Sequence, residues 1–314
     1  MKYKIVFMGT PSFAVPSLKK LYESNLFEIL SVYTQADKPV GRKQILTPSE
    51  VKLFALDKNL YIKQPNKIKN NDEVLQHLKS LNLDFIIVVA YGKILPKSIL
   101  EIPKYGCINV HGSLLEKYRG AAPIQWAIAN GETKTGVTIM KMDEGMDTGD
   151  IYTKSEVEIK FDDTYLTLSE KLSRIGAELL LETLPKIAKD ELKPIKQNND
   201  LATMAPIIKK EDGLINWNNS ALSIYNLNRA FTPWPLTYTY FKGKLLKIIK
   251  CFPIDDEKKG LPGEIINVNK NNFSVSTGKG KLLIETLQLE GSKKMSASDF
   301  IKGYRIKNGL ILGK

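Results

Sequence analysis

Residues 106–150 read GCINVHGSLLEKYRGAAPIQWAIANGETKTGVTIMKMDEGMDTGD. Within this stretch, Asn109 and His111 alternate with the apolar residues Ile108 and Val110, and a period of two is typical of a β-strand with one buried face. Asn109 and His111 therefore point to the same side, and the glycine that follows them ends the strand. The pattern predicts an amide and an imidazole close together at a strand end.

A second strand-like run at residues 136–142 leads into the acidic, glycine-containing segment DEGMDTGD at 143–150. Open α/β sheets bind ligands beyond the carboxyl ends of their parallel strands. If the two strands are parallel neighbours, a carboxylate of this segment meets Asn109 and His111. A carboxylate favours the charged form of a nearby imidazole, which suits a group that stabilises an oxyanion or donates a proton. The stretch therefore predicts a catalytic site.

The first half of the chain alternates between strand and helix patterns. Apolar runs at 5–8, 29–34 and 84–90 predict strands, and the last is apolar almost throughout, as in a strand covered on both faces. Amphipathic patterns at 14–22 and 71–81 predict helices. We therefore expect an α/β fold with a Rossmann-like, mostly parallel sheet and helices on both faces.

The pattern changes after a long helix predicted at 166–184. Short alternating runs separated by Gly- and Asn-containing turns then suggest a small barrel or sandwich, and we expect a smaller C-terminal β-barrel of the OB-like type. A polar segment with prolines reads as a linker between the two parts. The expected domains are 1–190, a linker at 191–208, and a basic β-barrel domain at 209–314.

Composition indicates the class of protein and its compartment. The 314 residues are 43% hydrophobic and 25% charged, which is typical of globular proteins. No run approaches the roughly 18 apolar residues needed to cross a bilayer. The chain begins at once with a strand-like run, so we expect no signal peptide, and its two cysteines fit a reducing compartment. We expect a cytoplasmic protein.

The net charge of +12 is spread unevenly along the chain. Residues 201–314 carry 18 Lys and Arg against 9 Asp and Glu. A basic module suggests a polyanionic partner, most simply a nucleic acid. Solvated surface lysines explain the same excess equally well, so charge alone does not decide between the two.

Other functional classes fit the sequence less well. The first strand-to-helix turn, GTPSFAVPS, has one glycine in place of the three of a dinucleotide-binding fingerprint. Cys107 lies four strand residues from His111, about 13 Å at about 3.3 Å per residue. This is too far for His111 to activate it, so we expect Cys107 to pack in the core.

We expect His77 to be solvated on the polar side of its helix. The acidic segment lacks calcium-loop spacing, and without a cysteine cluster or a histidine pair we expect no metal.

Residues 113–120, SLLEKYRG, allow two interpretations. The segment leaves the glycine break with alternating apolar and polar residues, which fits the wall of a pocket for a flat heteroaromatic ring. It fits equally well a surface connection before the next helix.

Longer motifs resemble a known family. FMGTPSFAVPSL, AYGKILP, GCINVHGSLL, YRGAAPIQWAI and GVTIMKMDEGMDTGDI are similar to those of the folate-dependent formyltransferases, and the similarity continues through FTPWP, PGEI and MSASDF. It covers nearly the whole chain, and the basic C-terminal module favours the members that act on tRNA. The resemblance implies transfer of the formyl group of 10-formyltetrahydrofolate, a dissociable co-substrate, to the α-amine of methionyl-initiator tRNA in translation initiation.

The resemblance also implies roles for individual residues. Asn109, His111 and Asp147 correspond to the catalytic asparagine, histidine and aspartate of the family. Glu116 replaces a usual proline in the tetrahydrofolate-contacting segment, and because proline pre-orders a loop, we expect a more mobile wall here. The four residues of that segment are Ser113, Leu114, Leu115 and Glu116.

A basic loop that enters the acceptor arm of the tRNA in this family corresponds to residues 35–49. It carries Lys38, Arg42 and Lys43, has Ala36 where proline is common, and is slightly short. Without the resemblance, the same residues read as a solvated surface loop.

Two other functions stay open. A related enzyme that formylates a sugar-nucleotide or glycinamide amine would keep the three catalytic residues without needing the basic module. A non-catalytic RNA-binding protein on the same scaffold would have no reason to keep them. For the tRNA-directed enzyme, we expect a monomer without membrane association.

Overall fold

The computed structural model describes residues 2–41, 44–256 and 260–313. The chain divides into two compact units. The first consists of Met1–Pro123, Lys134–Glu158 and Ser169–Pro206, and the second of Ile124–Thr133, Ile159–Leu168 and Ile207–Lys314.

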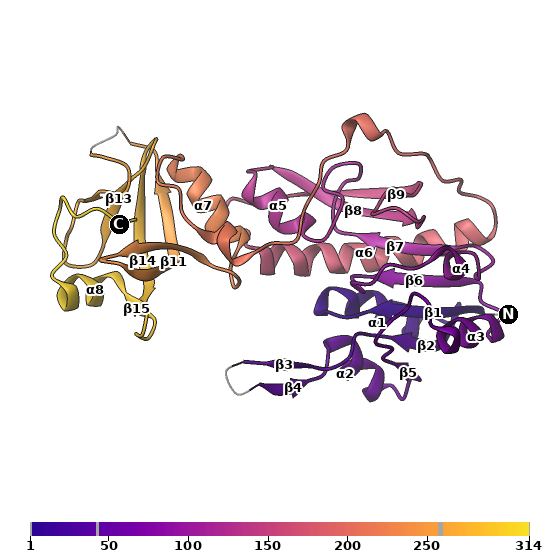
Figure 1. Cartoon of the computed structure of the whole chain (residues 1–314). Helices are drawn as coiled ribbons and strands as arrows, with labels where there is room; N and C mark the ends of the chain where they lie inside the picture. The colour runs from indigo at the N-terminus through magenta and orange to yellow at the C-terminus, as the bar shows by residue number, and fades with distance from the viewer. Residues whose placement is uncertain (1, 42–43, 257–259, 314) are drawn as a thin grey trace. The chain divides into compact units, whose positions relative to one another are not determined.

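The first unit is built on a seven-stranded sheet in the order β5-β2-β1-β6-β7-β8-β9 (Figure 1). The first five strands in this order pair in parallel, whereas β8 pairs antiparallel with both of its neighbours, β7 and β9. The prediction of a Rossmann-like, mostly parallel sheet is therefore confirmed. The strands are β1 (Tyr3–Gly9), β2 (Phe27–Tyr33), β5 (Ile62–Lys63), β6 (Phe85–Val89), β7 (Cys107–His111), β8 (Lys134–Lys141) and β9 (Ile151–Glu158).

Helices cover both faces of this sheet, as predicted. On one face, α3 (Asp72–Ser80) and α4 (Lys97–Leu100) share an apolar cluster with Ile86 and Cys107 of the strands. On the other face, α6 (Tyr165–Ala188) runs close beside β7 (Figure 1), and a side chain at its Gly176 would touch Val110 at 2.9 Å. Within the described ranges, no helix combines the length and apolarity needed to cross a membrane.

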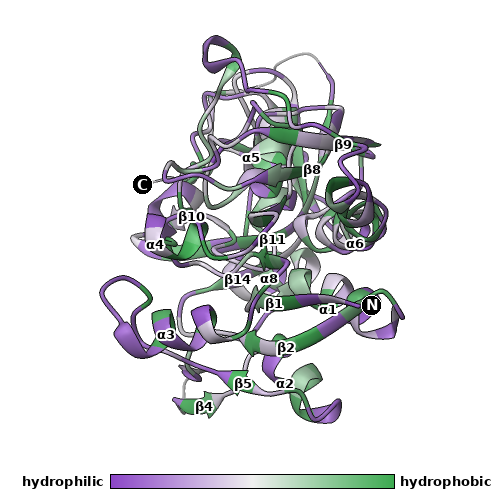
Figure 2. Ribbon diagram, turned by 90° about the vertical axis from the view of Figure 1, so that its right-hand side faces the viewer, coloured by the Kyte–Doolittle hydropathy of each residue, from purple (hydrophilic) through white to green (hydrophobic). Residues whose placement is uncertain are grey.

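The remaining elements of the first unit include two helices and a small hairpin. Hydropathy colouring shows hydrophobic residues along β1 and β2 and polar residues in the surrounding loops (Figure 2). A separate two-stranded hairpin follows β2 and is not part of the main sheet. These elements are η1 (Ser12–Ala14), α1 (Val15–Glu23), β3 (Lys38–Val40), β4 (Ile45–Thr47), α2 (Glu50–Asp57) and η2 (Asn199–Leu201).

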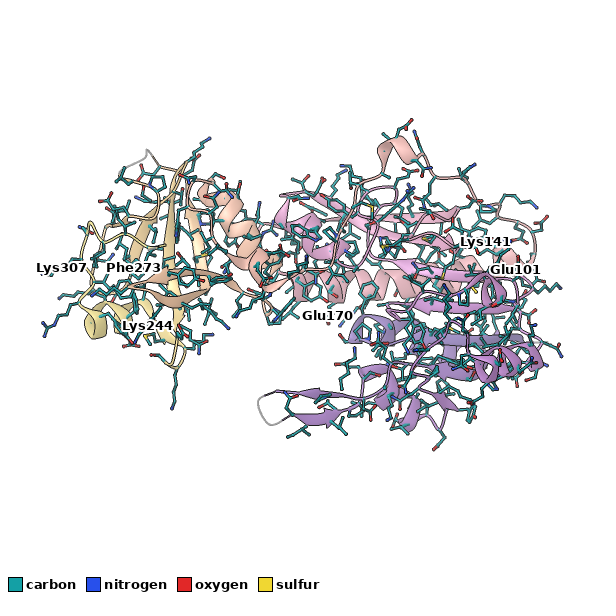
Figure 3. All side chains as sticks on the ribbon, in the orientation of Figure 1. Glu101, Lys141, Glu170, Lys244, Phe273 and Lys307 are labelled. Atoms are coloured by element: carbon teal, nitrogen blue, oxygen red, sulfur yellow. The ribbon has the colours of Figure 1, made fainter. Side chains whose placement is uncertain are left out.

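The second unit is built on an antiparallel sheet in the order β10-β11-β14-β13-β12, with β15 paired to β14. Its core contains Phe300, which is fully buried against the rings of Phe241 and Tyr304. Phe273 belongs to the same core, whereas Lys307 projects from the ribbon (Figure 3). The elements are α5 (Pro123–Ala129, all but its first residue), η3 (Lys210–Gly213), α7 (Ala221–Ala230), β10 (Thr237–Phe241), β11 (Lys244–Ile254), β12 (Ile265–Ile266), β13 (Phe273–Ser276), β14 (Lys281–Leu289), β15 (Met295–Ser296) and α8 (Ala297–Tyr304).

The C-terminal segment closes this sheet into a barrel. Gly309 N–H donates to the carbonyl oxygen of Ile265 at 2.9 Å, so the segment bonds to the β12 edge. Gly313 N–H donates to the carbonyl oxygen of Tyr240 at 2.8 Å, so the same segment bonds to the β10 edge. Because the two edge strands are joined in this way, the predicted small C-terminal barrel is confirmed.

Candidate active site

Strand β7 presents Asn109 and His111 on one face of the sheet. Both point away from the face on which Val110 meets α6, because side chains alternate along a strand. The neighbouring strands β6 and β8 help to bury them, and they are 8% and 5% exposed. The amide and the imidazole lie where the sequence pattern predicts them.

Asp147 reaches this face by a different route from the one predicted. The condition that the two strands be parallel neighbours is not met, because β7 and β8 pair antiparallel and Lys141 at the end of β8 lies opposite Ile108 near the start of β7. The loop at 142–150 must therefore turn back. Gly149 permits the turn, because a Cβ there would lie 1.9 Å from the Lys141 carbonyl oxygen. Asp147 itself has a φ of 54°, which aspartate tolerates better than most residues.

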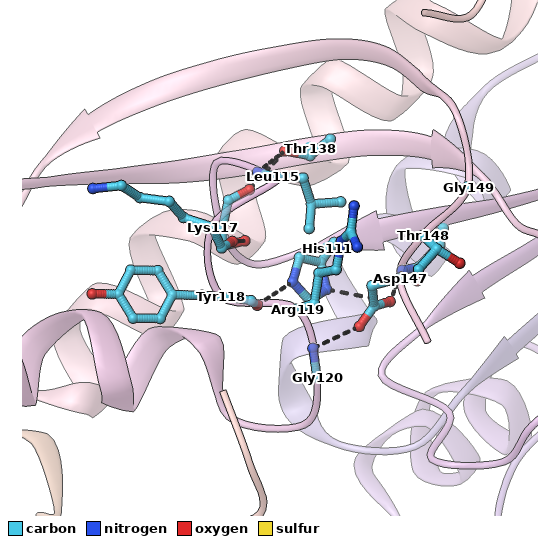
Figure 4. A network of polar contacts seen from close by, with 12 residues as sticks. His111, Leu115, Lys117, Tyr118, Arg119, Gly120, Thr138, Asp147, Thr148 and Gly149 are labelled. Atoms are coloured by element: carbon cyan, nitrogen blue, oxygen red, sulfur yellow. Dashed lines mark hydrogen bonds and ion pairs between the residues drawn. The ribbon is translucent and has the colours of Figure 1, made fainter. Parts of the chain in front are cut away.

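The three predicted catalytic side chains converge, and Figure 4 shows His111 and Asp147 side by side. His111 Nδ1 lies 3.6 Å from Asp147 Oδ1, and Asn109 Nδ2 donates to the same oxygen at 3.4 Å. Gly120 N–H donates to Asp147 Oδ2 at 2.9 Å, and His111 Nε2 lies 2.9 Å from the carbonyl oxygen of Tyr118. Both ring nitrogens thus face oxygen atoms. The site combines an imidazole, an amide donor and a carboxylate.

Two residues that sequence reasoning did not single out complete the surroundings of Asp147. Gln197 Nε2 donates to the carbonyl oxygens of Asp147 and Gly149 at 2.9 and 2.6 Å. Arg119 Nε and Nη2 donate to Gln197 Oε1 at 3.0 and 2.7 Å. Arg119 belongs to the motif YRGAAPIQWAI, which offered a signal, whereas Gln197 lies in the predicted linker without any local pattern.

The predicted tetrahydrofolate-contacting segment is tied to its neighbours on two sides. Leu115 N–H donates to Thr138 Oγ1 on β8 at 3.1 Å. The Glu116 carboxylate accepts the backbone N–H of Asn198 at 3.0 Å, and this bond is the main reason that the pKa of Glu116 lies below its usual value. The residue that replaces proline therefore brings an attachment of its own, while the greater mobility of the wall stays a prediction.

A cavity of about 470 Å³ opens beside this segment. Its lining includes the segment residues from Leu114 to Lys117 together with Lys154, Glu156 and Leu201. A larger hollow of about 640 Å³ is lined by Asp84 and Lys104, near the amino ends of β6 and β7 and away from the catalytic side chains. The smaller cavity is the one that adjoins predicted site residues.

The predicted tRNA loop is only partly described. Lys38 is exposed on β3 of the β3–β4 hairpin, while Arg42 and Lys43 lie outside the described residues. Near the start of the hairpin, Lys52 Nζ lies 2.7 Å from Asp37 Oδ2, and its hydrogen bonding holds the pKa of Asp37 below the usual value. The hairpin follows β2, which lies three strands from β7 in the sheet.

The remaining candidate residues are structural. Cys107 is fully buried, as predicted, and burial raises the pKa of its thiol to about 12. The expectation of a solvated His77 is wrong, because its ring packs beside those of Tyr33 and Tyr61, at centroid distances of 6.2 and 5.8 Å, and burial lowers its pKa. Across the part of the chain that the structure describes, no three His, Cys, Asp or Glu side chains are grouped to hold a metal ion.

Family models and curated relatives match nearly the whole chain. A model described as formyl transferase matches residues 2–184, and one described as formyl transferase, C-terminal domain, matches residues 207–305. A methionyl-tRNA formyltransferase of Caldicellulosiruptor saccharolyticus is 53% identical over 310 residues, covering 98% of this chain and 99% of the relative. That of Thermodesulfovibrio yellowstonii is also 53% identical over 310 residues, covering 99% of each.

Solved structures share the fold. WlaRD, a sugar 3N-formyl transferase, aligns with a TM-score of 0.67 and 24% identity, covering 93% of this chain and 100% of that one. HypX from Aquifex aeolicus in complex with tetrahydrofolic acid aligns with a TM-score of 0.61 and 17% identity, covering 96% of this chain and 48% of that one. Since one family model spans residues 2–184 of the 314 and relatives at 53% identity span nearly all of them, the chain belongs to the formyl transferase family.

Proposed function

We propose that the chain transfers the formyl group of 10-formyltetrahydrofolate to the α-amino group of methionyl-initiator tRNA, in support of translation initiation. Relatives that are 53% identical over nearly the full length carry the name methionyl-tRNA formyltransferase, which supports this pair of substrates. The observation that carries the proposal is the convergence of Asn109, His111 and Asp147 at the end of β7.

The reaction is a direct attack of the uncharged α-amine on the formyl carbon. As the new C–N bond forms, the formyl oxygen gains negative charge. The second N–H of Asn109 Nδ2 donates to this oxygen, and protonated His111, whose ring nitrogens face Asp147 and Tyr118, stabilises it through its positive charge. Asp147, 3.6 Å from His111 Nδ1, orients the ring and keeps it charged, and it accepts the proton of the amine through a water molecule. The C=O bond then re-forms as the bond from the formyl carbon to the folate nitrogen breaks, and that nitrogen takes the proton that Asp147 had accepted. Positioning of the two substrates lowers the barrier without a covalent enzyme intermediate.

The folate donor is placed against the segment of Ser113, Leu114, Leu115 and Glu116. Two features support this placement: the segment leads directly from His111, and it lines the cavity of about 470 Å³. A solved structure with the same fold is described as a complex with tetrahydrofolic acid. The donor binds and leaves with each turnover, and no metal is required.

The tRNA acceptor is placed against Lys38, Arg42 and Lys43 and against the basic domain at 209–314, with the catalytic domain at 1–190 and the linker at 191–208. Exposed basic side chains of the barrel, such as Lys244 and Lys307, support an electrostatic contribution to binding. Because charged initiator tRNA is used in translation, we place the enzyme in the cytoplasm, as a monomer away from membranes.

The proposal is tested by incubating the protein with labelled 10-formyltetrahydrofolate and either methionyl-initiator tRNA, glycinamide or an amino-sugar nucleotide. Label on the tRNA, abolished or cut about 10²-fold in His111→Ala, is the expected result. Label on a small amine alone would assign the chain to another acceptor. Binding of tRNA without any transfer of label would indicate a non-catalytic RNA-binding protein.

A further inference from the structure

Gln197, in the segment predicted as a linker, is bound to the loop that carries Asp147. Its side chain is buried, and Nε2 donates to the carbonyl oxygens of Asp147 and Gly149 at 2.9 and 2.6 Å. Gln197 Oε1 accepts two hydrogen bonds from Arg119, at 3.0 and 2.7 Å. Because a guanidinium group can only donate, the amide oxygen must face Arg119 and the amide NH₂ must face the two carbonyls. The orientation of the Gln197 amide is therefore fixed.

These hydrogen bonds connect Asp147 to Arg119 through Gln197, and a further bond connects it to the residue after Arg119. Arg119 directly precedes Gly120, whose N–H donates to Asp147 Oδ2 at 2.9 Å. Tyr118, directly before Arg119, places its carbonyl oxygen 2.9 Å from His111 Nε2. Asp147 is thus held at its backbone through Gln197 and at its carboxylate through Gly120. Both attachments lead to the same short segment that contacts His111.

Arg119 is itself held by further hydrogen bonds. Arg119 N–H donates to the carbonyl oxygen of Thr203 at 2.8 Å, and the Arg119 carbonyl oxygen accepts the N–H of Ala205 at 2.7 Å. Arg119 Nη2 also donates to Asn199 Oδ1 at 2.9 Å, and the residue is 6% exposed. Burying a guanidinium group without hydrogen-bond acceptors costs free energy, and Gln197 and Asn199 supply these acceptors to Arg119.

We propose that Gln197 is a positioning residue for the formyl transfer, a role that rests on the proposed function. It holds Asp147, whose backbone has a φ of 54°, at the spacing of 3.6 Å from His111 Nδ1. Without the two Gln197 donors, the carbonyl oxygens of Asp147 and Gly149 lose their partner and the loop shifts. A displacement of about 1 Å at a catalytic group lowers turnover by about 10²-fold.

The test compares Gln197→Met and Gln197→Glu in the full-length protein, with Gln76→Glu as the control. Gln197→Met keeps the volume but removes both the donors and the acceptor for Arg119. Gln197→Glu also removes the donors, but it keeps the acceptor for Arg119 and gains an ion pair with it. For both variants we expect kcat to fall about tenfold to 10²-fold with KM for either substrate within about twofold. Gln197→Glu should keep the melting temperature of the wild type. Gln76→Glu introduces the same charge on the exposed side of α3 and should leave kcat unchanged.

Combination with Asp147→Asn decides whether Gln197 acts through that carboxylate. If it does, Gln197→Met lowers kcat by less than about twofold in the Asp147→Asn background, because residues that act as a unit are not additive. An equal loss in both backgrounds, or kcat within about twofold of wild type in Gln197→Glu, would overturn the proposal.

A second readout does not depend on activity. The chain has only two histidines, so the ring ¹⁵N signals of His111 can be assigned with His77→Gln. Gln197→Met should shift the His111 signals in the same direction as Asp147→Asn and leave those of His77 in place. Unchanged His111 signals would refute the positioning role. Absence of formyl transfer in the wild type would refute the proposed function alone, since the signals would still report on Gln197.

Discussion

Replacement of Asp147 by asparagine removes a single negative charge from the centre of the site. The side chains of His111 and Asp147 are 6% and 19% exposed, and Nδ1 and Oδ1 are 3.6 Å apart. At this separation, two unit charges attract by about 4 to 5 kcal/mol with an effective dielectric constant of about 20. Asparagine keeps the shape and an oxygen for Gly120 N–H, so part of the geometry survives. With each factor of ten in rate worth about 1.4 kcal/mol, we expect kcat to fall by about 10² to 10³.

The assay is formylation of methionyl-tRNA at saturating concentrations of both substrates, followed by determination of each KM. Both KM values should stay within about threefold, because the charge acts on the transition state more than on the bound substrates. Glu144→Gln is the matched control, since it removes one negative charge from an exposed position of the same loop. Turnover of Asp147→Asn within about threefold of wild type, or a loss of similar size in Glu144→Gln, would show that the Asp147 charge does not stabilise the transition state.

Three further predictions concern the folate wall, the tRNA loop and the barrel core. Glu116→Ala should raise KM for the folate donor about tenfold, which is the scale of one charge-assisted hydrogen bond of about 1.5 kcal/mol. Glu116→Gln can still accept the Asn198 N–H, so its KM should stay close to that of the wild type. Folding lowers the pKa of Glu116, so the charged carboxylate stabilises the fold above its unfolded pKa of about 4.3, and this stabilisation is lost at lower pH. The free energies of unfolding of wild type and Glu116→Gln, measured in urea, should therefore converge as the pH falls below about 4. Arg42→Ala should raise KM for the tRNA and leave kcat within about twofold of wild type. In filter-binding measurements, the affinity of the wild type for tRNA should fall steadily as the salt concentration rises. An affinity that does not change with salt would exclude the electrostatic contribution. Phe300→Ala should lower the free energy of unfolding by about 3 to 5 kcal/mol in denaturant titrations that follow the barrel, because the ring is fully buried.

The position of the amide and the imidazole could be predicted from the amino-acid pattern alone. The alternation around Asn109 and His111 requires them to share a face, since side-chain direction in a strand depends only on residue parity. Apolar periodicity likewise predicted the strand–helix order of the first unit and the short strands of the barrel. The departure at Glu116 was visible in the sequence too, but its bond to Asn198, 82 residues away, was not.

The path by which the Asp147 carboxylate reaches His111 could not be predicted without the three-dimensional fold. Periodicity carries no information on pairing direction, because parallel and antiparallel strands show the same alternation, and β8 proved antiparallel to β7. Asp147 therefore reaches His111 through a loop that turns back, and not from the end of a parallel neighbour. Gln197 bonds to Arg119, 78 residues away, and to the Asp147 backbone, 50 residues away. Contacts of this kind depend on how distant segments pack, so no pattern within the polar segment around Gln197 could reveal them.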